Sequence, residues 1–314
     1  MAGFQHDREQ FEAGLREAGE LIEGQLREAG EHFREANEEL NRRAKRPLLS
    51  AILTGLVLGA IVIVGLFIPP VLAVFGILLI ALAAFELATA LRESGRRVPR
   101  IPLVVLTAAT VAASYWLGAW WHWVVFLAGC GLLLLWRLAE LLAPRLRGTA
   151  RVVAADIGAA VFVLGYVAFL ASFITLLLGQ PDGPAWVLSF LVVVVVVDIA
   201  AFAVGVSLGR HPMAPKVSPS KSWEGFGGAA AGALIAGVVV SAFLLGQPWW
   251  FGLIFGVVLL ATATIGDLAE SLVKRDLGVK DMSSWLPGHG GVLDRIDGII
   301  LSAPAAYVLY LIVH

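Results

Sequence analysis

The sequence has little charge and almost no cysteine. Only 15% of its 314 residues are Asp, Glu, Lys or Arg, whereas 59% are hydrophobic, and the mean hydropathy is +0.84. This composition cannot supply the polar surface of a soluble globule of this length. The single cysteine, Cys130, lies in an apolar run without a partner, which excludes a disulfide framework and a zinc site. We therefore expect an integral membrane protein.

Long apolar runs predict an all-α, polytopic fold with about nine transmembrane helices. A helix needs roughly 20 mostly apolar residues to cross a hydrocarbon core of about 30 Å. The runs that approach this length are residues 48–68, 71–91, 101–117, 119–137, 155–178, 185–206, 227–246, 249–268 and 298–313. We expect no signal peptide, because no short apolar core with a cleavage site precedes the first run.

The basic residues are distributed asymmetrically. All 23 Lys and Arg residues lie in the N-terminal tail or in alternate connections between the expected helices, and the opposite connections contain one formal charge, Asp182. Short cytoplasmic loops carry the Lys/Arg excess of a membrane protein. We therefore expect the N-terminus and the basic loops to be cytoplasmic and His314 to lie on the far side.

The first 46 residues form a separate region that is rich in Glu and Arg. The motif LREAGE begins at Leu15 and again at Leu26. Five apolar residues follow one another at steps of 4, 7, 4 and 7, which is close to 3.67 residues per helical turn; they are Phe11, Leu15, Ile22, Leu26 and Phe33. This spacing predicts an amphipathic cytoplasmic extension over residues 1–46 that pairs with a second copy or lies on the membrane surface. The alternative is a solvated charged segment. Residues 47–314 then form the transmembrane domain, with polar loops at 207–228 and 267–298.

Four acidic residues lie within or at the edges of the expected spans: Glu86, Asp156, Asp198 and Asp267. A carboxylate at the centre of a membrane helix costs roughly 2.5–3.5 kcal/mol, so such groups usually face a protein interior and serve a function. For Glu86 and Asp156 the structural alternative is a pairing with a neighbouring Arg. For Asp198 and Asp267 we favour a functional role.

The C-terminal polar segment contains carboxylates at helical spacing. If the helix of Asp267 continues, Ser271 and Lys274 lie on the same face, four and seven residues later. Asp294 and Asp297 are three residues apart, so one helical turn would direct both carboxylates the same way. Carboxylates that converge on one point need a hard cation such as Mg²⁺ to offset their repulsion.

Glycines and cations surround these carboxylates. Gly288, Gly290 and Gly291 allow close backbone approach and can form anion-binding nests of N–H groups, while Arg295 points away from Asp294 and Asp297. The basic residues that could neutralise phosphate oxygens are Lys274, Arg275, Lys280 and Arg295. Such a set is typical of phosphoryl or nucleotidyl transfer. His289 either orients a phosphate, donates a proton or acts only as a hydrogen-bonding support.

A second polar segment, residues 210–228, lies on the same side. Its prolines stiffen it, Lys216 and Lys221 are basic, and its serines offer hydroxyls to a phosphate or to a helix start; these are Ser218, Ser220 and Ser222. The alternative is an ordinary capped helix start in which Glu224 forms a local ion pair with Lys221.

These residues resemble a known family. The run SLVKR from Ser271, the pair KD from Lys280 and the run LPGHGGVLDRID from Leu286 together resemble the complete signature of the phosphatidate cytidylyltransferases, also called CDP-diacylglycerol synthases. SPSKSWEG from Ser218 resembles the family's second conserved stretch. The family's third conserved stretch is matched here by a set of residues that resembles it: Asp198, Gly205, Gly209 and Arg210. The resemblance covers residues 50–314 and departs from the family pattern at Ile199, Ala200, Phe202 and Val206.

The resemblance implies transfer of CMP from CTP to phosphatidate, which gives CDP-diacylglycerol and pyrophosphate. Mg²⁺ is the implied cofactor, with a second cation such as K⁺ left open. The implied partners are CTP, phosphatidate and membrane lipid, without nucleic acid, and a homodimer is a further expectation. We expect the cell inner (plasma) membrane as the location, with a cytoplasmic active site.

The resemblance also implies roles for individual residues. The metal ligands would be Asp267 and Asp294, helped by Asp297. The expected catalytic residues are Asp267, Lys274, Arg275, Asp294, Arg295 and Asp297. The expected residues for nucleotide and cofactor binding are Asp198, Ser218, Lys221, Glu224, Lys280, His289, Gly290 and Gly291.

Two other functions stay open. One is a related CTP-dependent isoprenoid-lipid kinase or ether-lipid cytidylyltransferase, which could share the C-terminal chemistry. The other is a non-enzymatic scaffold or transporter. A conduit would carry ionisable groups through both halves of the bilayer, whereas here they gather in one half, which favours an enzyme at the membrane interface.

Overall fold

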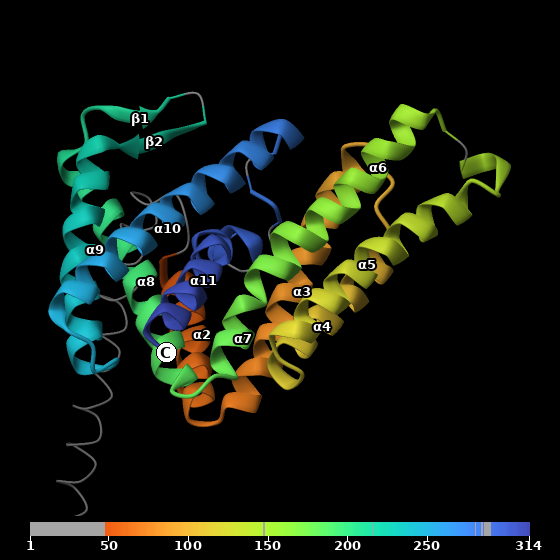
Figure 1. Ribbon diagram of the computed structural model, residues 1–314. Helices are drawn as coiled ribbons and strands as arrows, with labels where there is room; N and C mark the ends of the chain where they lie inside the picture. The colour runs from red at the N-terminus through yellow and green to blue at the C-terminus, as the bar shows by residue number, and fades with distance from the viewer. Residues whose placement is uncertain (1–47, 147, 216, 280, 284, 286–289) are drawn as a thin grey trace, which may run out of the picture. The chain divides into compact units, whose positions relative to one another are not determined.

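The computed structural model describes residues 48–146, 148–215, 217–279, 281–283, 285 and 290–314 (Figure 1). The predicted amphipathic extension, residues 1–46, lies outside the described residues and stays a prediction. The chain divides into two compact units, Met1–Val57 and Leu58–His314, and every residue of the candidate site belongs to the second.

The regular secondary structure of the described residues is helical, apart from one short hairpin. The predicted all-α membrane fold is therefore confirmed. The helices are α2 (Leu48–Phe67), α3 (Pro69–Glu93), α4 (Arg100–Trp116), α5 (Ala119–Glu140), α6 (Ala150–Val163), the π-helical turn η2 (Leu164–Phe169), α7 (Phe173–Leu178), α8 (Gly183–Leu208), α9 (Trp223–Phe243), α10 (Trp249–Leu277) and α11 (Leu293–Val313). A single 3-10 turn, η1, spans Pro144–Leu146. The hairpin pairs β1 (Pro212–Ala214) antiparallel with β2 (Ser218–Ser222).

Seven described helical segments are long and apolar enough to cross a membrane. Residues Ala150–Leu178, which contain α6, η2 and α7, count as one of them. Two further apolar helices, Gly55–Phe67 within α2 and Arg100–Trp116, are shorter. The multi-pass architecture is therefore confirmed, whereas the count of nine full spans is not.

The connections between helices alternate between two ends of the bundle. Figure 1 shows the β1–β2 hairpin and the α5–α6 connection at one end, and the α4–α5, α7–α8 and α9–α10 connections at the other. The hairpin precedes α9, whose first turn is capped because Ser222 Oγ accepts a hydrogen bond from Gly225 N at 3.1 Å. The predicted serine-capped helix start is thus confirmed at Ser222.

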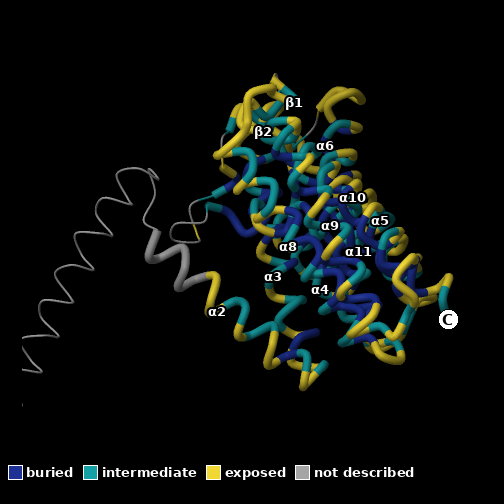
Figure 2. The backbone as a smooth tube through the Cα atoms, turned by 90° about the vertical axis from the view of Figure 1, so that its left-hand side faces the viewer, coloured by how far each residue is buried: buried dark blue, intermediate teal, exposed yellow. Residues whose placement is uncertain are grey.

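Two apolar clusters form the core, and α11 contributes to both. One cluster joins α7, α8, α9 and α10 to the C-terminal half of α11, and the other joins α3, α4 and η2 to the first turns of α11. In Figure 2 the buried stretches alternate with exposed ones along the helices, as expected for helices with one packed and one outward face. The two clusters therefore meet near the middle of α11, where Ile299 packs against both.

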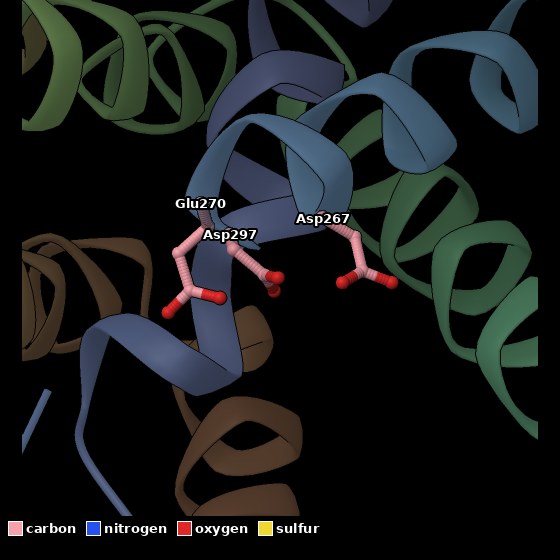
Figure 3. A group of neighbouring side chains, drawn as sticks. All are labelled: Asp267, Glu270 and Asp297. Atoms are coloured by element: carbon pink, nitrogen blue, oxygen red, sulfur yellow. The ribbon is translucent and has the colours of Figure 1, made fainter. Parts of the chain in front are cut away.

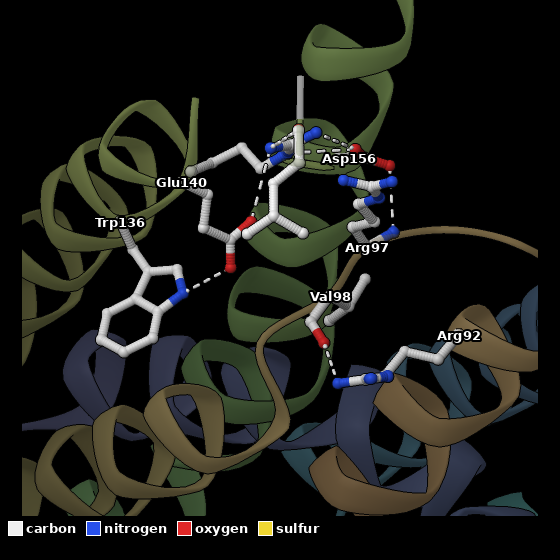
Figure 4. Close-up of polar contacts among 8 residues, drawn as sticks. Arg92, Arg97, Val98, Trp136, Glu140 and Asp156 are labelled. Atoms are coloured by element: carbon white, nitrogen blue, oxygen red, sulfur yellow. Dashed lines mark hydrogen bonds and ion pairs between the residues drawn. The ribbon is translucent and has the colours of Figure 1, made fainter. Parts of the chain in front are cut away.

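The buried Asp156 forms the structural ion pair expected from the sequence. Its Oδ2 lies 3.0 Å from Arg137 Nη2, and its Oδ1 accepts a hydrogen bond from Arg97 N at 3.0 Å (Figure 4). The side chains of Arg137 and Asp156 are 4% and 1% exposed. This pair ties α5 to α6 and to the segment that precedes α4, away from the candidate site.

Candidate active site

A cavity of about 460 Å³ is lined by α8, the hairpin, α9, α10 and α11. One part of its wall is apolar and comes mainly from α8 and α9; it includes Val197, Ala201, Phe202, Val206, Phe226 and Ala229. The other part is charged and comes from α8, β2, α10 and α11; it includes Asp198, Lys221, Asp267, Asp294, Arg295 and Asp297. The cavity can therefore contact both an apolar group and an anion.

Helix α10 carries the first carboxylates of this cavity. It continues through Asp267 to Leu277, as predicted, and stops where Gly278 adopts a left-handed φ of 71°. The Val279 N–H then donates to Lys274 O at 3.0 Å, which closes the last turn of the helix. The helical spacing places Asp267, Glu270 and Lys274 on one face of α10.

Three carboxylates from α10 and α11 converge. Ligand atoms of Asp267, Glu270 and Asp297 lie within 4.8 Å of one another (Figure 3). Gly266 makes this approach possible, because an added Cβ there would lie only 2.5 Å from Asp297 O. The backbones of α10 and α11 are thus in contact beside the two aspartates.

This group of carboxylates fits a divalent cation. Glu270 is 1% exposed, and its Oε1 is buried without a hydrogen-bond partner among the described residues. A buried carboxylate oxygen without a partner is costly, so the position suits a positively charged ligand. Oxygen ligands at this spacing are those that Mg²⁺ prefers.

Two lysines offset part of the negative charge. Lys221 Nζ pairs with Asp267 Oδ2, and Lys274 Nζ lies 2.6 Å from Glu270 Oε2 and 3.1 Å from Asp294 Oδ1. Burial lowers the pKa of Lys221, although the carboxylates of Asp297 and Asp198 act in the opposite direction. Lys274 therefore links α10 to α11, and Lys221 links the hairpin to α10.

Comparison with known proteins shows the family of the chain. Residues 49–313 match the model of the Cytidylyltransferase family. The chain belongs to this family. It is 39% identical over 277 residues to a protein named phosphatidate cytidylyltransferase from Mycobacterium tuberculosis (strain ATCC 25618 / H37Rv), a match that covers 85% of this chain and 83% of the relative. It is 38% identical over 284 residues to the protein of that name from Mycobacterium leprae (strain TN), covering 85% and 88%.

A third relative matches over a shorter stretch. The phosphatidate cytidylyltransferase of Brucella suis biovar 1 (strain 1330) is 41% identical over 146 residues, which are 46% of this chain and 54% of the relative.

Most predicted acidic residues of this cytidylyltransferase family member meet at the cavity. Asp198, Asp267, Asp294 and Asp297 all line it. Arg295, expected among the catalytic residues, lines it too. The compact carboxylate group, however, contains Glu270 where we expected Asp294. Asp294 instead accepts hydrogen bonds from Lys274 Nζ, Gly291 N and Met282 N.

Other predicted residues have partners outside the cavity. Arg275 Nε donates to Val217 O at 3.2 Å, in the turn between β1 and β2. Glu224 Oε1 lies 2.5 Å from His211 Nδ1, so the local ion pair expected between Glu224 and Lys221 is wrong. Among the described residues, Ser220 and Ser222 line the cavity and Ser218 does not. Lys280 and His289 lie outside the described residues.

The predicted anion-binding glycine nest is wrong at Gly291, whose N–H donates to Asp294 Oδ2. Gly290 adopts a left-handed φ of 82°, as a tight turn requires. The following N–H groups of Gly291, Val292 and Leu293 donate to the carboxylates of Asp294 and Glu86 at 2.9–3.0 Å. These amides hold protein carboxylates. The Arg pairing expected for Glu86 is wrong as well, because its oxygens take these amides and the Ser283 hydroxyl.

Glu270 is the residue that sequence reasoning missed. It follows Asp267 by three residues and precedes Lys274 by four, so the helical spacing that selected those two residues also includes Glu270. Its position two residues beyond the apolar run 249–268, at the edge of the expected span, was a second available signal, because ionisable groups close to the membrane are often functional.

Proposed function

We propose that this chain transfers the cytidylyl group of CTP to phosphatidate, giving CDP-diacylglycerol and pyrophosphate. The observation that carries the proposal is the group of Asp267, Glu270 and Asp297 in a cavity with one apolar and one charged wall. Membership of the cytidylyltransferase family and the names of the mycobacterial relatives support the same reaction.

The two walls suit two different substrates. Phosphatidate has a phosphate headgroup attached to acyl chains, and the apolar residues of α8 offer a surface for the lipid part. Phe202 and Val206, which line the cavity, are each 73% exposed, so the apolar wall continues onto the outer surface of α8. CTP is a soluble polyanion, and Lys221 and Arg295 offer positive charge to its phosphates.

The chemistry is an in-line displacement at the α-phosphorus of CTP. A phosphatidate oxygen forms the new bond to that phosphorus, the bond to the bridging oxygen of the β-phosphate breaks, and pyrophosphate leaves. Asp267, Glu270 and Asp297 would hold a divalent cation, Mg²⁺ by ligand type, that offsets negative charge on the reacting phosphates.

The chain's own side chains position and neutralise the reactants. Lys221 and Arg295 would bind phosphate oxygens, and Lys274, which is not among the described residues that line the cavity, pairs with both Glu270 and Asp294. Catalysis of phosphoryl transfer depends mostly on such positioning and charge neutralisation.

The location and assembly belong to the same proposal. The cavity would open to the cytoplasm, where CTP is found, and the protein would reside in the cell inner (plasma) membrane. The asymmetry of the basic residues supports this orientation. A homodimer remains a prediction.

Incubation of the purified full-length chain with phosphatidate, Mg²⁺ and each of the four nucleoside triphosphates tests the function. We expect lipid-linked nucleotide from CTP and equimolar pyrophosphate. A parallel reaction with a polyprenyl phosphate in place of phosphatidate distinguishes an isoprenoid-lipid enzyme. Transfer to the isoprenoid alone, or no transfer with any nucleotide, would contradict the proposal.

A further inference from the structure

Glu86 connects helix α3 to the start of α11 across more than two hundred residues of sequence. We propose that Glu86 is a positioning residue: it fixes the N-terminal end of α11, and with it the carboxylates of Asp294 and Asp297. The inference rests on the proposed function for the chemistry of the site, and its test includes a measurement that needs no turnover.

The carboxylate of Glu86 receives three hydrogen bonds. Oε1 accepts from Ser283 Oγ and from Val292 N, the latter at 3.0 Å, and Oε2 accepts from Leu293 N at 2.9 Å. These donors lie on both sides of the glycine segment that precedes α11. Glu86 is only 2% exposed, so its oxygens have little access to solvent that could replace these donors.

Helix α11 depends on this external cap. Its N-cap residue is Val292, whose side chain has no hydrogen-bonding group and makes no cap hydrogen bond. The first N–H groups of a helix have no partner within the helix, and a carboxylate there satisfies them and interacts favourably with the helix dipole. Glu86, on α3, therefore supplies the hydrogen-bond acceptor that the side chain of Val292 cannot provide.

Gly291 lies between the carboxylate of Glu86 and the carboxylate of Asp294. An added Cβ at Gly291 would lie 3.1 Å from Glu86 Oε2 and 3.1 Å from Asp294 Oδ2, so both carboxylates lie against the same glycine. The Gly291 N–H donates to Asp294 Oδ2 at 2.9 Å. Asp297 follows Asp294 by three residues on α11, so a shift of this helix start moves both aspartates.

A Gln at position 86 keeps the length of the side chain but cannot make all three bonds. One carboxylate oxygen becomes an NH₂ group, which is a donor and cannot accept from another N–H. Either the Leu293 amide or the Val292 amide and Ser283 hydroxyl would then face a donor. A buried donor left without an acceptor drives the helix start to move.

The test compares Glu86→Gln with Glu93→Gln in the full-length protein in detergent. Glu93 is exposed on the same helix, so its Gln variant removes the same charge away from α11. The first measurement is the dissociation constant of Mn²⁺, from the electron paramagnetic resonance signal of free Mn²⁺. The second is the Mg²⁺ concentration that gives half-maximal formation of CDP-diacylglycerol.

We expect Glu86→Gln to weaken Mn²⁺ binding by about tenfold or more, because loss of a group that orients metal ligands typically costs 10–100-fold in metal affinity. The Mg²⁺ requirement should rise by a similar factor. Glu93→Gln should stay within about twofold of the wild type in both measurements. A folded Glu86→Gln protein, with the wild-type thermal midpoint and unchanged Mn²⁺ affinity, would overturn the inference.

If Glu86→Gln does not fold, Ser283→Ala takes its place, because it removes only one donor to Glu86. We expect it to weaken Mn²⁺ binding several-fold, and an unchanged affinity would overturn the inference. Wild-type protein that binds Mn²⁺ but transfers no nucleotide would contradict the proposed function. The Mn²⁺ affinities of the variants would still decide the role of Glu86.

Discussion

Gly266→Ala places one methyl group where α10 and α11 touch. The added Cβ would lie 2.5 Å from Asp297 O and 3.2 Å from Asp297 C, both backbone atoms that cannot rotate away. Ordinary van der Waals contact begins at 3.4 Å, so the two helices must separate locally by about 0.9 Å. This movement would increase the distance between Asp267 and Asp297, two of the three carboxylates that converge in the cavity.

A misplacement of about 1 Å in a catalytic site can lower the rate on the order of 100-fold, equivalent to about 2.7 kcal/mol in the activation free energy. We expect this loss in kcat for formation of CDP-diacylglycerol by the purified variant. Gly158→Ala is the matched control, because Gly158 lies in α6 and an added Cβ there meets nothing within 4 Å. A Gly266→Ala enzyme as active as Gly158→Ala would refute the close approach of α10 and α11 as a requirement for activity.

Three further changes test separate parts of the structure. Asp294→Asn should lower kcat about 100-fold, because its carboxylate orders Lys274 and the Gly291 amide; near-normal steady-state turnover would contradict this role. Asp156→Asn should lower the free energy of unfolding by about 3–5 kcal/mol, since Arg137 would keep a buried charge without its main partner. Thermal unfolding in detergent would measure this loss, and Glu140→Gln, at the more exposed partner of Arg137, should cost only about 1 kcal/mol. Removal of divalent cations with a chelator should abolish transfer and added Mg²⁺ should restore it; transfer that persists in the chelator would exclude the proposed cation.

Hydropathy located the helices well because a transmembrane helix is defined by its own composition. Each apolar run of the sequence falls on one helix, except residues 155–178, which fall on α6, η2 and α7. Helix α10 continues beyond its apolar run to Leu277, which meets the condition set for Asp267, Ser271 and Lys274 to share a face. Helical periodicity likewise placed Asp294 and Asp297 at one cavity. The position of a helix and the face on which a residue lies both depend on residues close by in the sequence, so the sequence was sufficient to predict them.

Contacts between distant helices could not be predicted in the same way. Lys221 pairs with Asp267, 46 residues away, and Glu86 bonds to Leu293, 207 residues away. Periodicity assigns a residue to a helix face but does not say which other helix that face meets. The structural alternatives for Glu86 and Lys221, an Arg and Glu224, were therefore the nearest groups of opposite charge in the sequence.

The central claim is that Asp267, Glu270 and Asp297 jointly hold the divalent cation of the reaction. Anomalous scattering at the manganese edge, from crystals of the full-length protein grown with Mn²⁺ and CTP, tests it most directly. We predict a peak at about 2.0–2.2 Å from a carboxylate oxygen of each of the three residues. A peak coordinated by other residues, with Glu270 still unliganded, would contradict the claim.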